Sequence, residues 1–296
     1  SGKHSGKQEK VKNKKNRKGL KIFGIVVLVL VLIIAGIIAG GAWYVGDKLG
    51  KIDFDSELSE DDIEVNSGIS EKLSKYRNIA LFGLDSRTDS LDESRSDCII
   101  IVSINEETKE CLIIDPGAAA RQLASRIKAD ALKPVAVLLT HGHFDHAGAA
   151  KELAEEFEIL IYAHEAEEDT LKEPRKNVSW MVGREESYKA DVYVNERETL
   201  NLAGFSIQVI HTPGHTKGGC CYYFKDEQVL FSGDTLFRGT WGRTDVPTGD
   251  FEDIISSITK KLMILPDETI VYAGHGKSTM IREEKPIYLE LRPRLL

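Results

Sequence analysis

Cysteine is scarce in this chain of 296 residues, with only 4 copies. Their positions (Cys98, Cys111, Cys220 and Cys221) lack the paired spacing of a zinc finger, so the sequence gives no support for a structural zinc module. Cys98 and Cys111 lie in apolar runs, and the adjacent Cys220 and Cys221 point to opposite faces if they lie on a strand. We therefore expect small, buried hydrophobic side chains at all four positions.

A net positive charge is missing from the chain after residue 21, and no internal repeat of fixed period is visible. The formal net charge is -8, although residues 1–21 are crowded with Lys and Arg. An acidic main body does not attract nucleic acid over long distances, so we expect no nucleic-acid partner. The 42% hydrophobic and 29% charged residues suit one sizeable globular domain with additional segments.

Charge of either sign is absent from residues 22–45, a run longer than the roughly 20 residues with which a helix crosses a bilayer. We expect a single transmembrane helix here; cleavage as a signal peptide at the small residues 39–42 is the alternative. The basic residues 1–21 predict a cytoplasmic tail, which places the chain after Asp47 outside the membrane. The acidic, Ser-rich residues 46–77 are interpreted as a juxtamembrane linker.

The remaining sequence alternates between apolar strand-like runs and amphipathic segments. Strands are expected at 78–87, 98–104, 110–117, 134–140, 159–164, 205–211, 220–224, 228–234 and 269–276. Helices are expected at 118–131, 148–157 and 251–265. Helices that interleave with two groups of strands indicate a layered domain of the α/β class.

The stretch THGHFDHAG, residues 140–148, holds three of the 8 histidines of the chain and an aspartate. It follows an apolar strand, and the carboxyl ends of strands are where α/β folds bind ligands. His141 and His143 face the same way on extended chain, and Asp145 and His146 lie beyond them on a turn. One ion cannot conveniently take all four side chains, whereas two ions can. The alternative is a solvated loop with incidental histidines.

Further metal-ligand types follow later apolar runs. His215 lies in HTPGHT, Asp234 in FSGDTLF and His275 in AGHG, each beside a glycine. These positions strengthen the prediction of a metal site, because they extend the set of imidazole and carboxylate groups at strand ends.

These motifs, in this order and spacing, closely resemble the metallo-β-lactamase superfamily and, within it, the glyoxalase II-like hydrolases. The resemblance covers about residues 111–289 and implies an αββα sandwich, with the hydrolase domain at 111–296. It implies a first metal ion on His141, His143 and His215, and a second on Asp145, His146 and His275. Asp234 would bridge the two ions. His164 and His211 would then not be ligands.

Such a ligand set suits two divalent metal ions; we expect zinc, with iron or manganese as alternatives. Water between two such ions loses a proton near neutral pH, and the ions polarise a carbonyl group. Asp145 would orient the resulting hydroxide. Because a thiolate leaves without strong protonation, a small-molecule thioester is the expected substrate.

Two related activities compete with this prediction. The metallo-β-lactamases proper lack a bridging carboxylate at the place of Asp234, so lactam hydrolysis is not expected. Persulfide dioxygenases, which use one iron ion, are similar around FRGTWGRTD at 237–245 and remain the main alternative. In that segment the guanidinium group of Arg243 could bind a substrate carboxylate by two parallel hydrogen bonds. The alternative is a structural ion pair with Asp245 or Asp250.

Residues 1–110, with the tail, the apolar span and the segment 78–110, resemble a second family, the LytR-CpsA-Psr envelope phosphotransferases. In that family the residues that match Asp85, Arg87 and Asp97 help to bind metal and a lipid pyrophosphate. The resemblance ends at about Glu110, so no complete catalytic domain of this kind is expected. We predict instead that residues 98–104 pair with 111–115 as a hairpin and supply the first strand of the metal-binding domain.

The sequence therefore predicts a membrane-anchored dinuclear metallohydrolase whose catalytic domain lies outside the membrane. If the fusion of the N-terminal segment is not natural, a cytoplasmic enzyme is expected. The non-enzymatic alternative is an anchored envelope protein whose metal domain is inactive.

Overall fold

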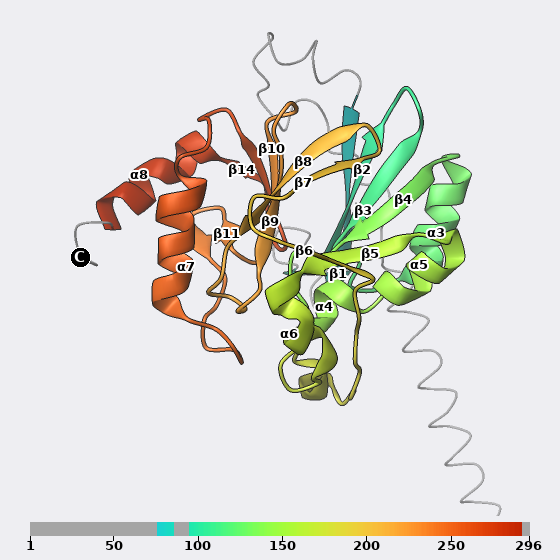
Figure 1. Ribbon diagram of the computed structural model, residues 1–296, viewed down its shortest axis with the longest axis horizontal. Helices are drawn as coiled ribbons and strands as arrows, with labels where there is room; N and C mark the ends of the chain where they lie inside the picture. Colours follow the sequence, from blue (N-terminus) through green and yellow to red (C-terminus); the bar gives the residue numbers. More distant parts are fainter. Residues whose placement is uncertain (1–75, 86–94, 292–296) are drawn as a thin grey trace, which may run out of the picture. The chain divides into compact units, whose positions relative to one another are not determined.

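The computed structural model describes residues 76–85 and 95–291, which contain two six-stranded sheets (Figure 1). The first sheet has the order β1 (Tyr76–Asp85), β2 (Arg95–Asn105), β3 (Glu110–Ile114), β4 (Lys133–Leu138), β5 (Leu160–His164) and β6 (Val192–Val194). The second has the order β14 (Thr279–Met280), β13 (Ile270–Ala273), β10 (Val229–Gly233), β9 (Cys220–Phe224), β8 (Phe205–His211) and β7 (Thr199–Leu202). A short ribbon pairs β11 (Leu236–Phe237) with β12 (Thr240–Trp241).

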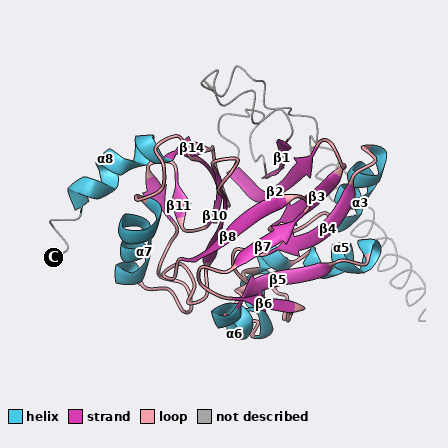
Figure 2. Cartoon of the chain, turned by 45° about the horizontal axis from the view of Figure 1, so that its top comes forward, coloured by secondary structure: helices cyan, strands magenta, loops and turns pink. Residues whose placement is uncertain are grey.

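Helices cover the outer face of each sheet (Figure 2). The first sheet packs against α3 (Ala120–Ala129) and α5 (Ala150–Phe157). The second packs against α7 (Phe251–Ser257), the π-helical turn η5 (Ile258–Leu262) and α8 (Ile281–Leu291). Along the chain, α4 (Phe144–Ala147) lies between α3 and α5. Three short helical turns follow β5: η3 (Glu165–Glu167), α6 (Glu168–Lys172) and η4 (Ser179–Val182).

Alternation along the strands builds the layers. In β3, Leu112 and Ile114 join the core between the two sheets, whereas Cys111 and Ile113 face the helices of the first layer. The two inner faces meet in one cluster of apolar side chains, with Phe224 of β9 among them. The central strands of the second sheet are buried on both faces, so β9 and β10 are buried at every position. The αββα sandwich implied by the sequence is confirmed.

The cysteines follow the same alternation. Cys220 lies in the core between the sheets, and Cys221 lies in the core under α7, so the adjacent pair points to opposite faces as predicted. Cys111, Cys220 and Cys221 are free thiols and fully buried. Burial raises the pKa of Cys111 and of Cys221 to about 12, which keeps both thiols neutral and unreactive. The side chain of Cys98 lies outside the described residues.

The hairpin predicted at the start of the domain is present. β2 and β3 run antiparallel, with Ile101 opposite Ile114 and Ile104 opposite Cys111. β1 pairs in turn with β2 and forms the edge of the same sheet. Residues 98–104 are therefore part of the first sheet and are not detached from it.

Several boundaries differ from the sequence prediction, and two of the differences have a clear structural cause. The strand expected at 110–117 ends at Ile114, since Asp115 has a φ of 51° and turns the chain. The single helix expected at 251–265 changes into a π turn, in which the N–H of Met263 donates to the carbonyl of Ile258 at 2.9 Å.

The membrane prediction falls on residues 22–45, which lie outside the described part of the chain, as do the predicted tail and most of the predicted linker. Within residues 76–85 and 95–291, no helix combines the length and the apolar character that a bilayer crossing requires.

Candidate metal centre

The seven side chains predicted as ligands come from four loops that follow strands. β4 leads into the turn with His141 and His143, and α4 carries Asp145 and His146. The other three follow strands of the second sheet: His215 comes after β8, Asp234 directly after β10, and His275 shortly after β13. β10 and β13 are parallel, so Asp234 and His275 leave the second sheet at the same edge. The structure brings all seven together.

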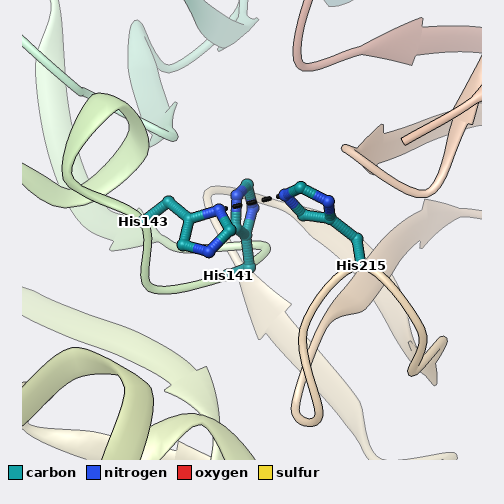
Figure 3. Close-up of side chains that lie close together, drawn as sticks. All are labelled: His141, His143 and His215. Atoms are coloured by element: carbon teal, nitrogen blue, oxygen red, sulfur yellow. Dashed lines mark hydrogen bonds between the residues drawn. The ribbon is translucent and has the colours of Figure 1, made fainter. Parts of the chain in front are cut away.

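The first group consists of His141, His143 and His215 (Figure 3). One nitrogen from each ring lies within 4.8 Å of the others, and all three residues are buried. Nε2 of His215 is 3.0 Å from Nδ1 of His143. Nδ1 of His215 lies 2.7 Å from the carbonyl oxygen of Arg243, which can only accept, so this nitrogen donates and Nε2 keeps its lone pair for the site.

The second group consists of Asp145, His146 and His275, again with ligand atoms within 4.8 Å of one another. Nε2 of His275 lies 3.4 Å from Oδ2 of Asp145 and 3.3 Å from Nε2 of His146. The side chains of Asp145 and His275 are each 28% exposed, whereas that of His146 is 2% exposed. Solvent therefore reaches the centre from the side of Asp145 and His275.

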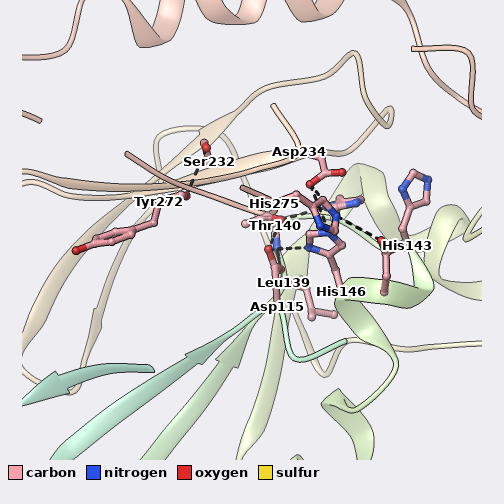
Figure 4. Close-up of polar contacts among 12 residues, drawn as sticks. Asp115, Leu139, Thr140, His143, His146, Ser232, Asp234, Tyr272 and His275 are labelled. Atoms are coloured by element: carbon pink, nitrogen blue, oxygen red, sulfur yellow. Dashed lines mark hydrogen bonds and ion pairs between the residues drawn. The ribbon is translucent and has the colours of Figure 1, made fainter. Parts of the chain in front are cut away.

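Asp234 lies between the two groups (Figure 4). Its Oδ2 is 3.4 Å from Nε2 of His215 in the first group, and its Oδ1 is 3.4 Å from Nε2 of His146 in the second. Nε2 of His275 lies 3.7 Å from the same Oδ1. One carboxylate thus offers an oxygen atom to each group.

Asp115 is a functional residue that the sequence prediction missed. Its carboxylate accepts hydrogen bonds from the backbone N–H of Thr140 at 2.7 Å and from the Thr140 hydroxyl at 2.6 Å. Oδ2 of Asp115 also lies 3.1 Å from Nδ1 of His146, which leaves Nε2 of that ring facing the site. The available signal was the acidic residue at the end of ECLIID, one strand away from the histidine motif.

Two glycines allow the close packing of this centre. A Cβ atom on Gly274 would lie 2.2 Å from Oδ1 of Asp234 and 2.6 Å from Cε1 of His146. A Cβ atom on Gly242 would lie 1.8 Å from the carbonyl oxygen of Asp234 and 3.2 Å from Nδ1 of His215. A side chain at either position would displace these groups, so the segment 237–245 packs its backbone against the centre.

Burial keeps His141 and His143 of the first group neutral. It lowers the pKa of His143 to about 3, with His215 adding to the effect, and it lowers the pKa of His141 well below the ordinary value, with His146 and His143 adding. Nε2 of His141 is buried and has no hydrogen-bond partner within the described part of the chain. Buried polar atoms are rarely left unpaired, so this nitrogen calls for a ligand.

The carboxylates dominate the second group. Burial favours the neutral form of Asp234, but the neighbouring His146, His275 and His215 outweigh it and hold the pKa of that carboxyl well below its usual range. Burial opposes charge on His146 too, yet Asp234 and Asp115 raise the pKa of this imidazole well above its usual value. Ionised carboxylates that gather cations around them, beside neutral imidazoles with unpaired nitrogens, fit divalent metal ions.

The predicted substrate residue Arg243 is in an ion pair. Its Nε and Nη2 donate to the two oxygens of Asp245 at 2.7 and 2.8 Å, with both side chains largely exposed. Asp250, the other predicted partner, accepts from the N–H of Asp253 and caps α7 instead. Of the two ion pairs that the sequence left open, the structure contains the one between Arg243 and Asp245.

His164 and His211 stack on each other, with ring centroids 4.1 Å apart and planes inclined by 7°. Nδ1 of His164 accepts from the N–H of Ala166, and Nε2 of His211 faces the carbonyl of Lys217. Among the described residues, neither ring belongs to a group of three or more potential ligands.

The chain is similar to several known proteins. The family model of the metallo-beta-lactamase superfamily matches residues 91–275, so the match includes β2 as well as the four loops of the centre. The hydroxyacylglutathione hydrolase GloC of Haemophilus influenzae is 40% identical over 183 residues, which are 61% of this chain and 86% of that protein.

Two solved structures agree with this match. The crystal structure of BLEG-1, described as a B3 metallo-beta-lactamase, is 40% identical, has a TM-score of 0.61, and covers 64% of this chain and 91% of BLEG-1. The crystal structure of TTHA1623 in a di-iron-bound form is 34% identical, has a TM-score of 0.53, and covers 59% of this chain and 86% of the other.

Proposed function

The chain belongs to the metallo-beta-lactamase superfamily and is a metallo-hydrolase, and from that premise we propose that it hydrolyses the thioester bond of small S-acyl thiols with two divalent metal ions. The position of Asp234 carries this proposal. A buried carboxylate that reaches both groups of ligand atoms suits a pair of ions better than a single ion.

We propose the division of ligands between the two ions that the family resemblance implies. His141, His143 and His215 would hold the first ion; Asp145, His146 and His275 would hold the second; Asp234 would touch both. When bound, such a pair lowers the pKa of a water molecule and stabilises negative charge on a carbonyl oxygen. We propose zinc; iron and manganese suit the same donors, and the di-iron form of the similar TTHA1623 makes iron the first alternative to test.

The protein's own groups orient the reaction. Asp145 combines a place in the second group with 28% exposure, so its carboxylate can accept a hydrogen bond from the attacking water and direct it. Asp115 fixes the ring of His146, and the carbonyl of Arg243 fixes the ring of His215. Both contacts fix the orientation of an imidazole ring, so that its lone pair faces the site. The site then needs less reorganisation when substrate binds.

The substrate class follows from the leaving group. A thiolate departs without a proton donor, so a site built from metal ligands alone is sufficient for a thioester. The similarity to a hydroxyacylglutathione hydrolase supports an S-acyl thiol of this kind. Because BLEG-1 is described as a metallo-beta-lactamase, a β-lactam belongs in the same substrate panel.

Two other readings are less well supported. A mononuclear iron persulfide dioxygenase leaves the second group and Asp234 without a shared role, and Gly242 and Arg243 in the segment 237–245 already have structural roles at the centre. The non-enzymatic alternative requires an inactive metal domain, whereas β2 pairs in register with β3 and the candidate ligands lie close together.

We predict that the purified full chain binds about two metal ions and cleaves an S-hydroxyacyl glutathione. His143→Ala and Asp234→Ala should each lower kcat/KM by at least about 100-fold, because a lost ligand is more damaging than a lost supporting contact, which typically costs 10- to 100-fold. His211→Ala, which removes a histidine outside the centre, is the control and should keep the wild-type rate. One iron per chain, with oxygen consumption on a persulfide, would establish the dioxygenase instead.

Binding of a substrate carboxylate by Arg243 stays a proposal, and its ion pair with Asp245 provides the control. If Arg243 leaves Asp245 to bind substrate, Arg243→Ala should raise KM about tenfold with little change in kcat, since a charge-assisted hydrogen bond contributes about 1.5–3 kcal/mol. Asp245→Ala should leave KM unchanged or lower it. Steady-state kinetics with a glutathione thioester decide the question. Equal effects of the two substitutions would show that the arginine serves only the ion pair.

We also propose that residues 22–45 anchor the protein, with residues 1–21 in the cytoplasm and the hydrolase domain outside. The likeness of residues 1–110 to LytR-CpsA-Psr proteins stays a prediction. The full chain should remain in the membrane pellet at alkaline pH. Leu30→Lys combined with Ile34→Lys should release it, since each lysine at the helix centre costs about 2.5–3.5 kcal/mol. A wild-type chain that is found in the soluble fraction would favour the cytoplasmic alternative.

A further inference from the structure

Glu167 is a fully buried acidic residue at the end of η3 that has no part in the ligand set described above. Its carboxylate accepts three hydrogen bonds. The N–H of Gly142 donates to Oε1 at 2.9 Å, and the hydroxyl of Thr216 and the N–H of Gly218 donate to Oε2 at 3.0 and 2.8 Å. The burial and the number of donors show that the site is built to hold a carboxylate.

The three donors lie in the two loops that carry the first group. Gly142 stands between His141 and His143, and Thr216 directly follows His215. Each oxygen of Glu167 therefore binds a different loop. A single side chain joins the turn after β4 to the loop between β8 and β9, which come from different sheets.

Gly218 makes this contact possible. A Cβ atom there would lie 2.2 Å from the backbone nitrogen of Glu167 and 2.5 Å from Oε2. Any larger residue would push the loop with His215 away from the carboxylate. The glycine of the sequence HTKGG is thus explained by its approach to Glu167 rather than by contact with a ligand.

The donors to Glu167 are neutral, so its negative charge depends on hydrogen bonds and on the surrounding field. Burial raises the pKa of Glu167 to about 7, although the hydrogen bonds from Gly142 and Thr216 oppose the change. A cation among the three histidines would favour the ionised carboxylate behind them, and the carboxylate would favour the cation.

We propose that Glu167 is a positioning residue that sets the separation between the histidine pair His141 and His143 and the histidine His215, and thereby the affinity of the first metal group. This inference rests on the proposed two-ion function. It adds that one of the two ions depends on a residue that touches neither ion.

A matched control exists elsewhere in the fold. Glu284 is also buried, at 1% exposure, and it accepts from the N–H of Gly239 and from the hydroxyl of Thr279. It joins the turn between β11 and β12 to β14, and neither of its donors is next to a predicted ligand in the sequence, whereas Gly142 and Thr216 are. If a buried, hydrogen-bonded glutamate matters only for stability, Glu167 and Glu284 should behave alike.

The test compares Glu167→Gln with Glu284→Gln in the full chain. Glutamine keeps the size but turns an NH2 group toward N–H or O–H donors, so both variants should melt at a lower temperature in the metal-free state. Zinc affinity is measured by competition with a chelator, which requires no activity. In Glu167→Gln, one of the two binding steps should weaken by about 10- to 100-fold, and the other should not change. In Glu284→Gln, both steps should match the wild type.

A second pair of variants, with smaller changes, is used if Glu167→Gln does not fold. Thr216→Val removes one of the three donors to Glu167, and Thr279→Val removes the equivalent donor to Glu284. The first should weaken one zinc step severalfold, and the second should weaken neither.

The inference would be overturned by unchanged zinc binding in Glu167→Gln or, if that variant does not fold, in Thr216→Val. An equal loss of zinc affinity in the matching control, Glu284→Gln or Thr279→Val, would overturn it too. A wild-type protein that binds no divalent metal would overturn the proposed function together with it. A wild type with two ions and unaffected variants would overturn the inference alone.

Discussion

Ring nitrogens face one another at the edge of this sandwich, and the arrangement depends on what lies between them. Nε2 of His215 and Nδ1 of His143 are 3.0 Å apart, and Nε2 of His146 and Nε2 of His275 are 3.3 Å apart. A neutral imidazole has one N–H and one lone pair, so each pair of rings can share a proton or offer lone pairs to a cation. In His215 the N–H is at Nδ1, where the carbonyl of Arg243 accepts it, so Nε2 offers a lone pair to the site.

The fold supplies the rigidity that this crowding demands. Two packed sheets end at one edge, and carboxylates behind the ligands hold the loops there. Asp115 fixes the turn of Thr140 and the ring of His146, and Glu167 joins the two loops of the first group. The carbonyl of Arg243 orients His215 from the other side. The supporting groups come from several segments, so the ligands are pre-set before any ion binds.

The candidate ligands could be predicted from the sequence, and the residues that support them could not. His141, His143, Asp145 and His146 lie together in one short motif, and each later ligand follows an apolar run beside a glycine. Asp115, in contrast, acts on Thr140, 25 positions along the chain, and Glu167 acts on Gly218, 51 positions along. To predict such contacts one must know which strands are neighbours, and the periodicity of a sequence does not provide this information.

The start of the domain was predictable only in part. The place of 98–104 directly before the segment that resembles glyoxalase II-like hydrolases predicted that it would pair with 111–115, and the register of β2 on β3 confirms this. The position of β1 at the edge of the same sheet was not predicted, because a segment that resembles a second family gave no reason to place it there. The family match from residue 91 supports the inclusion of β2 in the metal-binding domain.

The most direct test of the two-ion account is anomalous X-ray scattering from crystals of the metal-loaded protein. The account predicts two peaks per chain, one at about 2.0–2.2 Å from nitrogens of His141, His143 and His215, and one at similar distances from Asp145, His146 and His275. Asp234 should reach both. A single peak, held by the first group with the second group left free, would contradict it.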